Sequence, residues 1–186
     1  MTMLATHTHT GALPKANTAV RGKIHYAIGK TALGAVLVAC GAVGVCAILM
    51  GSDADDLAAD LAKRFPSCRL VPDKLKLNED LSKIIRFINT PKRELDVKVE
   101  MHGTPFQCRV WTALRGVPIG STVTYSELAR RIGDPNAVRA IANACASNNL
   151  ALAVPCHRVV RSDGGLANYR WGVERKRALI AKEAAV

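Results

Sequence analysis

The chain has 186 residues, 49% of them apolar, which is enough for one ordinary domain or two small ones with a buried core. Lysine and arginine number 26 against 15 aspartates and glutamates, a formal charge of +11, and this excess favours a polyanionic partner such as nucleic acid or an anionic membrane surface. The six cysteines are spread singly with no C-x-x-C pair, so the chain has neither metal-ligand spacing nor the density of a disulfide scaffold.

Two interpretations compete at the N-terminal end of the chain. Residues 1–22 are expected to form a disordered tail, because they lack the basic, apolar and small-residue order of a signal peptide. Residues 32–51 carry no charge and are long enough to cross a bilayer. The same stretch also fits a buried β-hairpin, with AVLVA (35–39) and VCAIL (45–49) as its strands. The window by itself leaves the span and the hairpin open.

A small α/β unit is expected to follow. Leucines and a phenylalanine recurring every four residues predict a helix from Asp53 to Phe65, ended by Pro66. Apolar residues on one side predict a second helix over 77–89. The segment LDVKVEM (95–101) alternates apolar and polar residues, as an edge or half-buried strand does.

The pattern beyond Gly103 has helix-turn-helix spacing. Thr104-Pro105 is a cap with a proline at the first helical position, and the helix that it begins has Phe106, Val110 and Leu114 on one face. Thr124 and Glu127 form a capping box that begins a short helix running to about Arg131. A tight turn with Gly133 leads to a further helix expected to start at Asp134-Pro135.

The last of these helices has an unusual exposed face. Val138, Ile141 and Cys145 share one side, and small residues with a single Arg139 form the other. Short side chains suit the minor groove of DNA, which is only about 6 Å wide. An alanine-rich core helix explains the same composition, so the pattern alone decides neither.

The stretch VPCHRVV (154–160) places a thiol, an imidazole and a guanidinium in a row inside what reads as a buried strand. Cys156 is either an inert packing residue or a nucleophile that His157 activates. Neighbouring side chains of a strand point to opposite faces, so activation needs a bridging water or a bent backbone. Glu174 and Glu183 are both candidates to orient the imidazole.

Taken together, these segments resemble the O6-alkylguanine-DNA alkyltransferases, most closely the C-terminal half of the bacterial Ada type. The resemblance covers the chain from about residue 23. The segments that carry it are AVPCHRVV (153–160), NYRWG (168–172), Thr124-Tyr125, AVRA (137–140), FQxxVW (106–111) and GVCAILMGSD (44–53).

The resemblance implies a suicidal transfer reaction. Cys156 takes the alkyl group from O6 of guanine, and from O4 of alkylated thymine as a further substrate. His157 is the base, acting through water, and Glu183 rather than Glu174 orients it. Tyr125 donates a proton toward N3 of the departing guanine. The thioether is permanent, so one molecule repairs one lesion.

The resemblance also assigns binding roles. The base is held by the Cys156 carbonyl, Val159, Asn168 and Tyr169. Asn148 is the hinge between the DNA-reading helix and the active-site strand. Arg139 takes the place of the flipped-out nucleotide. The further residues expected at the DNA are Thr124, Tyr125, Ala140 and Arg158.

The fold implied is a small ribonuclease-H-like α/β domain (23–101) followed by a mostly helical, winged helix-turn-helix domain (102–186). In this fold residues 32–51 form the hairpin and not a membrane span. The expected partner is double-stranded DNA with O6-alkylguanine, bound through the minor groove by a monomer, without cofactor, metal or membrane. The expected location is the cytoplasm, at the nucleoid, or the nucleus of a eukaryote. Since no Ada-type N-terminal module is found, repair without a transcriptional switch is expected.

Three rival functions remain at this stage. A non-catalytic lesion-binding relative commonly replaces the cysteine by tryptophan, and Cys156 argues against that class. A helix-turn-helix transcription factor would keep the thiol only for packing and would bind a specific sequence. A cysteine hydrolase would turn over repeatedly on an ester or peptide.

Overall fold

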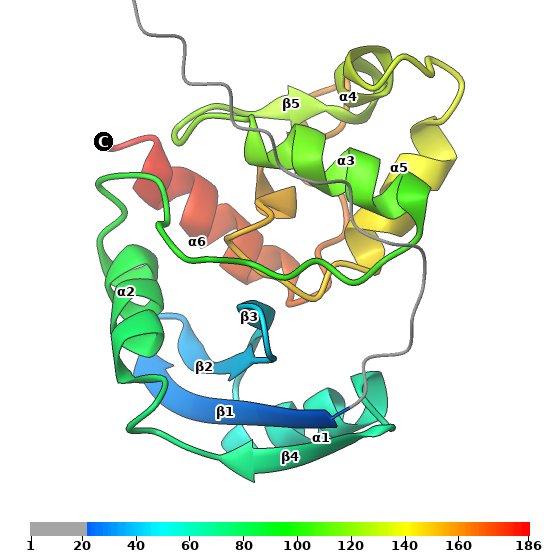
Figure 1. Ribbon diagram of the computed structural model, residues 1–186. Coiled ribbons are helices and arrows are strands. Elements are labelled where there is room, and N and C mark those ends of the chain that lie inside the picture. The colour runs from blue at the N-terminus through cyan, green and yellow to red at the C-terminus, as the bar shows by residue number, and fades with distance from the viewer. Residues whose placement is uncertain (1–21) are drawn as a thin grey trace, which may run out of the picture.

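The computed structural model describes residues 22–186, so the expected tail lies, apart from Gly22, outside the described residues. Figure 1 shows a β-sheet with two helices in the first half of the chain and a group of helices stacked on one side of it in the second half. This α/β arrangement agrees with the coarse fold class expected from the sequence.

The sheet has four strands in the order β3-β2-β1-β4. Strands β1 (Gly22–Thr31), β2 (Gly34–Cys40) and β3 (Val45–Gly51) form an antiparallel meander, and β4 (Cys68–Pro72) pairs in parallel with β1. The uncharged window therefore forms two buried strands, which confirms the hairpin. No helix within residues 22–186 has the length and apolar character to cross a membrane.

Two helices pack on the sheet where the sequence predicts them. Helix α1 (Ala54–Arg64) begins after Asp53, whose carboxylate accepts the backbone N–H groups of Asp55 and Asp56. Helix α2 (Asn78–Asn89) buries most of the apolar side predicted for it, namely Leu81, Ile84 and Ile88 with Leu77 just before the helix. The predicted Ile85 is only partly buried, and Phe87 is buried in addition. Both helices are amphipathic, and their buried faces form the core with β1, β2 and β3.

The second half is mostly helical. A capping box begins α4 (Tyr125–Arg131) at Thr124, as predicted. The predicted cap at Thr104 begins α3 (Pro105–Arg115) and is also a capping box, completed by Gln107. The remaining elements are β5 (Val123–Thr124), α5 (Val138–Ala146), a 3₁₀ turn (Cys156–Arg158), β6 (Val159–Val160) and α6 (Val173–Glu183). Helices α3, α4 and α5 pack on one another, and α6 packs on the 3₁₀ turn.

Two local expectations were wrong. The segment 95–101 forms no strand; it makes only an isolated bridge, in which Val99 lies against Val45 of the sheet edge. Val97 of the alternating pattern is buried, although the segment forms no continuous hydrogen-bond ladder with a neighbouring strand. Helix α5 begins at Val138, later than the predicted start at Asp134-Pro135. Ile141 and Cys145 are buried as expected, but Val138, at the first position of the helix, is exposed.

The outer edge of β3 joins the two halves of the chain. The Ile48 N–H donates to the Asn149 carbonyl at 2.8 Å, and the Ala151 N–H donates to the Ile48 carbonyl at 3.0 Å. An unpaired strand edge is thereby covered, and the loop that follows α5 is held at a defined position against the sheet. This loop leads directly into the Cys156 turn.

Candidate active site

Cys156 lies on a 3₁₀ turn and not on the strand expected from the sequence. The Arg158 N–H donates to the Pro155 carbonyl at 3.0 Å, and the Val159 N–H donates to the Cys156 carbonyl. Only after this turn does the chain become extended, in the two-residue strand β6. The bent backbone that the adjacent cysteine and histidine require is therefore present.

Asn148 contacts the thiol directly. Its Nδ2 lies 3.2 Å from Cys156 Sγ and 2.9 Å from the Val154 carbonyl. The Leu150 N–H donates to Asn148 Oδ1 at 2.8 Å, which identifies that atom as the oxygen and leaves Nδ2 to face the sulfur. The residue expected as a hinge is thus fully buried and supplies an N–H donor that stabilises negative charge on Sγ.

His157 is oriented by Glu183, a residue of α6. Its Nε2 lies 2.8 Å from Glu183 Oε1, and both side chains are buried. An ionised carboxylate only accepts hydrogen bonds, so Nε2 carries the proton and the lone pair of the neutral ring is on Nδ1. Nδ1 has no hydrogen-bond partner among residues 22–186, so its lone pair is free to accept a proton. Tyr169 packs edge-on against the imidazole, with ring centroids 6.4 Å apart.

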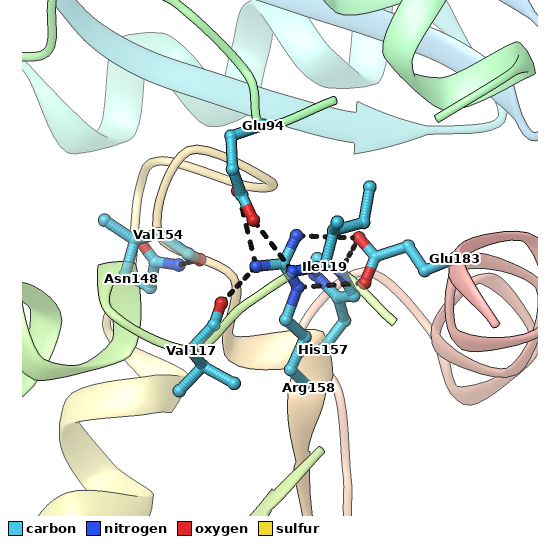
Figure 2. A network of polar contacts seen from close by, with 8 residues as sticks. All are labelled: Glu94, Val117, Ile119, Asn148, Val154, His157, Arg158 and Glu183. Atoms are coloured by element: carbon cyan, nitrogen blue, oxygen red, sulfur yellow. Dashed lines mark hydrogen bonds and ion pairs between the residues drawn. The ribbon is translucent and has the colours of Figure 1, made fainter. Parts of the chain in front are cut away.

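Arg158 does not reach DNA, which corrects the role expected for it. Its side chain is 1% exposed, and Nε and Nη2 donate to the two oxygens of Glu183 at 2.8 and 3.0 Å (Figure 2). Its Nη1 donates to the Val117 carbonyl and lies 3.5 Å from Glu94 Oε2. Arg158 therefore pairs with the carboxylate that orients the base.

The remaining glutamate, Glu174, plays no part in this network. It lies near the start of α6, is 83% exposed and pairs with Arg177. The geometry therefore supports Glu183 as the partner of His157, as the resemblance implies.

The thiol itself is poorly ionised at neutral pH. Burial raises the pKa of Cys156 to about 11, although the Asn148 hydrogen bond and the nearby Lys176 charge oppose the shift. A thiolate is the nucleophilic form, so Cys156 needs a base to remove its proton.

The protonation states of His157 and Glu183 suit the removal of the thiol proton. Burial lowers the pKa of His157 below its ordinary value, against the opposing effect of Glu183, so the imidazole is neutral at pH 7 and free to accept a proton. Burial alone would raise the pKa of Glu183, but hydrogen bonds and charges from His157 and Arg158 outweigh it and lower the value to about 2. The carboxylate is thus ionised and stabilises an imidazolium once it forms.

The sulfur faces a cavity of about 540 Å³ that is large enough for a flipped-out base. Its lining comes from α4, α5, the Cys156 turn and the loop 161–171: Tyr125, Ala142, Asn143, Cys145, Ala146, Cys156, Arg161, Ala167, Asn168, Tyr169 and Arg170. Burial raises the pKa of Tyr125 to about 12, so its phenol keeps its proton at neutral pH and is a hydrogen-bond donor.

Short-strand pairing places Tyr125 beside the nucleophile. Strand β5 pairs in parallel with β6, so Val123 is opposite Val159 and Thr124 is opposite Val160. Thr124 caps α4, and its hydroxyl accepts the Glu127 N–H at 3.1 Å. The first residue of α4, Tyr125, is thereby held at the mouth of the cavity.

Other predicted site residues lie outside the cavity lining. Arg139 and Ala140 are on the exposed face of α5. Val159 is fully buried, and its N–H is bonded to the Cys156 carbonyl. The two backbone groups expected to hold the base are thus bonded to each other in this state.

Sequence reasoning missed Lys176. It lies on the buried face of α6, and its Nζ donates to the Val159 carbonyl at 2.5 Å and to the Ala167 carbonyl at 3.3 Å. These bonds join α6 to β6 and to the loop 161–171, which is called the substrate loop because the resemblance places base contacts in it. The spacing of Lys176, Leu179 and Glu183 along one helix face is the signal that could have indicated its burial.

Metal-ligating clusters are absent from the described part of the chain: no three His, Cys, Asp or Glu side chains of residues 22–186 are grouped around a common point that could hold an ion. The described cysteines are all free thiols.

Comparison with known proteins agrees with this chemistry. Residues 105–185 match the family described as 6-O-methylguanine DNA methyltransferase, DNA binding domain. The chain is 36% identical over 148 residues to the methylated-DNA–protein-cysteine methyltransferase of Candida albicans, with 75% of this chain and 83% of that protein covered. It is 46% identical over 161 residues to the bifunctional transcriptional activator/DNA repair enzyme Ada of Escherichia coli, with 87% of this chain covered.

The match to the Escherichia coli protein covers 46% of that relative, so the chain spans just under half of its length. Among solved structures, Mycobacterium tuberculosis OGT in complex with DNA superposes with a TM-score of 0.73 at 30% identity, covering 87% of this chain and 93% of the other. The chain belongs to the methylated-DNA–protein-cysteine methyltransferase family.

Proposed function

We propose that this protein repairs DNA by transferring the alkyl group of O6-alkylguanine to Sγ of its own Cys156. The observation that carries the proposal is a cysteine facing a base-sized cavity, with an amide donor on its sulfur and a histidine–glutamate pair beside it. O4-alkylated thymine is proposed as a second substrate, because it presents the same alkyl–oxygen bond.

The proposed reaction begins with the thiol proton, which passes through water to Nδ1 of His157. The sulfur then attacks the alkyl carbon, so a C–S bond forms as the C–O6 bond breaks. The electron pair of that bond leaves with guanine, and Tyr125 offers its proton toward N3. The thioether has no leaving group at neutral pH, so the protein is consumed in one turnover.

Base recognition is proposed for residues that line the cavity beside Cys156. Asn168 and Tyr169 line it directly, and Tyr169 also packs on His157. For the Val159 N–H and the Cys156 carbonyl to contact a base, the bond between them has to lengthen when the base enters. Asn148 lies between α5 and the Cys156 turn and maintains the spacing of these two elements.

DNA is proposed to lie against α5 through its minor groove. The lesion is stacked inside a duplex, so the nucleotide has to flip out to reach a buried sulfur. The exposed side of α5 carries short side chains that permit close approach, and Arg139 projects from it to fill the gap in the stack. Ala140 and Thr124 are proposed to contact the DNA backbone. Residues 101–186 carry 12 of the basic and 5 of the acidic side chains, which favours phosphate binding.

The finer architecture is part of the same proposal. Residues 23–101 correspond to a ribonuclease-H-like domain, and residues 102–186 to a winged helix-turn-helix domain formed around α4 and α5. We expect a monomer without cofactor, acting where the chromosome lies: at the cytoplasmic nucleoid of a bacterium, or in the nucleus of a eukaryote.

The test is the intact mass of the protein after mixing with a duplex that carries one O6-methylguanine. A gain of about 14 Da that saturates at one per protein and maps to Cys156 is expected, because methyl replaces hydrogen on the sulfur. Tight binding without a mass gain would instead identify a lesion sensor.

Arg139→Ala is expected to slow repair of duplex DNA about tenfold or more, because an empty stack raises the cost of flipping. Free O6-benzylguanine needs no flipping, so its reaction should be almost unchanged. Single-turnover rates on both substrates measure the difference. Equal losses of rate on duplex DNA and on free O6-benzylguanine would exclude a flipping role for Arg139. Arg177→Ala is the control, because it removes the charge of an exposed arginine on α6.

A further inference from the structure

Glu94 belongs to neither helix nor strand, yet it contacts the buried network around His157. It lies in the segment that connects α2 to α3, and its side chain is 60% exposed. Its carboxylate nevertheless points inward toward Arg158, as Figure 2 shows. A surface segment therefore places a second carboxylate beside an arginine that is 1% exposed.

Each oxygen of Glu94 has a different partner. Oε1 accepts the Ile119 N–H at 2.7 Å, which ties the connecting segment to the loop between α3 and β5. Oε2 lies 3.5 Å from Nη1 of Arg158, the same nitrogen that donates to the Val117 carbonyl. The guanidinium is thus held by Glu183 along one edge and by Glu94 and Val117 at its remaining nitrogen.

Formal charges show what Glu94 adds. With a neutral imidazole, Arg158, Glu183 and Glu94 together carry one positive and two negative charges. When His157 accepts a proton, the four groups become neutral. Without Glu94 the same step would convert a neutral group into a positive one at a site where His157 and Arg158 are buried, and a buried uncompensated charge is costly.

The other charged groups around His157 increase the effect of the Glu94 charge. The other titratable or charged groups around His157 are Cys156 on its own turn, Tyr169 on the substrate loop, and Lys176 on α6. Lys176 adds a further positive charge and opposes an imidazolium. With Lys176 counted as well, protonation of His157 gives the site a net charge of +1 when Glu94 is present and +2 when it is absent, so Glu94 reduces the buried excess of positive charge.

We propose that Glu94 is a positioning residue for alkyl transfer, which holds Arg158 against Glu183 and favours the protonated state of His157 by its negative charge. This inference rests on the proposed function of Cys156. Glu94 touches neither the substrate nor the sulfur; it acts through Arg158 and Glu183.

The test compares the wild-type protein with Glu94→Gln, in which an amide oxygen still accepts the Ile119 N–H but the charge is lost. The rate of transfer is measured with free O6-benzylguanine, so that DNA binding does not enter. The range is about pH 4.5 to 9.5, which extends well below the ordinary histidine pKa of about 6.5 because burial lowers the pKa of His157. We expect the rate at pH 7 to fall about threefold to fivefold, the size of effect expected for a charge pair with one exposed partner. The acid limb should move to lower pH by about half a unit, because loss of the negative charge lowers the pKa of the His157 imidazolium.

Asp96→Asn is the matched control, since Asp96 is exposed on the same segment and takes no part in this network. It should leave both rate and profile unchanged. A Glu94→Gln rate and profile equal to wild type would overturn the proposal. So would a uniform loss at all pH values with a lowered Tm, because that pattern belongs to a purely structural tie. A wild-type protein that transfers nothing would refute the proposed function itself, which is a different result.

Discussion

Cys156→Ala is expected to abolish alkyl transfer completely while the protein still binds alkylated DNA. The substitution removes the atom that forms the new bond. The other thiol of the cavity, Cys145, is not expected to replace it, because burial raises its pKa while the Asn148 donor and the adjacent His157 base serve Cys156. The residues of α5 that are proposed to contact DNA are untouched. Intact mass measures the transfer, and a mobility-shift titration measures binding.

Cys108→Ala provides the matched control for loss of a thiol. Cys108 is buried in α3, outside the cavity lining, so its removal should leave a mass gain of one methyl group per protein. A methyl uptake by Cys156→Ala at the wild-type stoichiometry would contradict the assignment of the acceptor.

Glu183→Gln is expected to destabilise the fold and to stop most of the transfer. The amide cannot compensate the charge of Arg158, whose side chain is 1% exposed, and breaking a buried pair in this way costs about 3–5 kcal/mol. It also leaves His157 without the carboxylate that fixes its tautomer, so the rate should fall about a hundredfold or more. Urea denaturation and single-turnover kinetics measure the two effects.

Glu174→Gln makes the same chemical change on the same helix at an exposed position. Surface changes of this kind are usually within about 0.5 kcal/mol, so stability and rate should both be retained. A Glu183→Gln protein with a wild-type rate would exclude Glu183 from the reaction, whatever its stability.

The same residue predicts a pH dependence of stability. The pKa of Glu183 is lowered from its ordinary value of 4.5 to about 2 in the folded protein, because His157 and Arg158 stabilise the ionised carboxylate. A depressed folded-state pKa contributes stability that is complete above the unfolded value and is lost as pH falls toward the folded one. The Tm of the wild-type protein should therefore fall as pH is lowered from 4.5 to about 2, and the Tm of Glu183→Gln should fall less over the same range. Thermal denaturation at several pH values measures the difference.

Short-range signals were sufficient for most of the secondary structure. The cap at Thr104 and the capping box at Thr124 mark helix starts, because the groups that satisfy the free N–H donors are only a few residues apart. The alternation at 95–101 failed as a signal. A strand needs a partner along its length, and here only Val45 at the edge of β3 provides one.

The Cys156 turn shows the same limit within the site. Its apolar flanks resemble a strand, but the preceding loop pairs with Ile48 and passes through Leu152 at a φ of 69°, a left-handed conformation that redirects the chain. That path depends on β3, which lies about a hundred residues earlier in the chain, a range at which local pattern has no influence. The bend could therefore not be read from the flanking residues.

The sequence by itself determined the reactive elements: PCHR as the nucleophile with its base, Glu183 by its distance from the cysteine through family resemblance, and the small-residue face of α5. Only the tertiary structure decided which charges are buried. It places Arg158 on Glu183, Lys176 under the substrate loop and Glu94 beside Arg158. The physical reason is that a charged side chain reads as a surface residue until the fold supplies its partner, and each of these partners comes from a separate element of the structure.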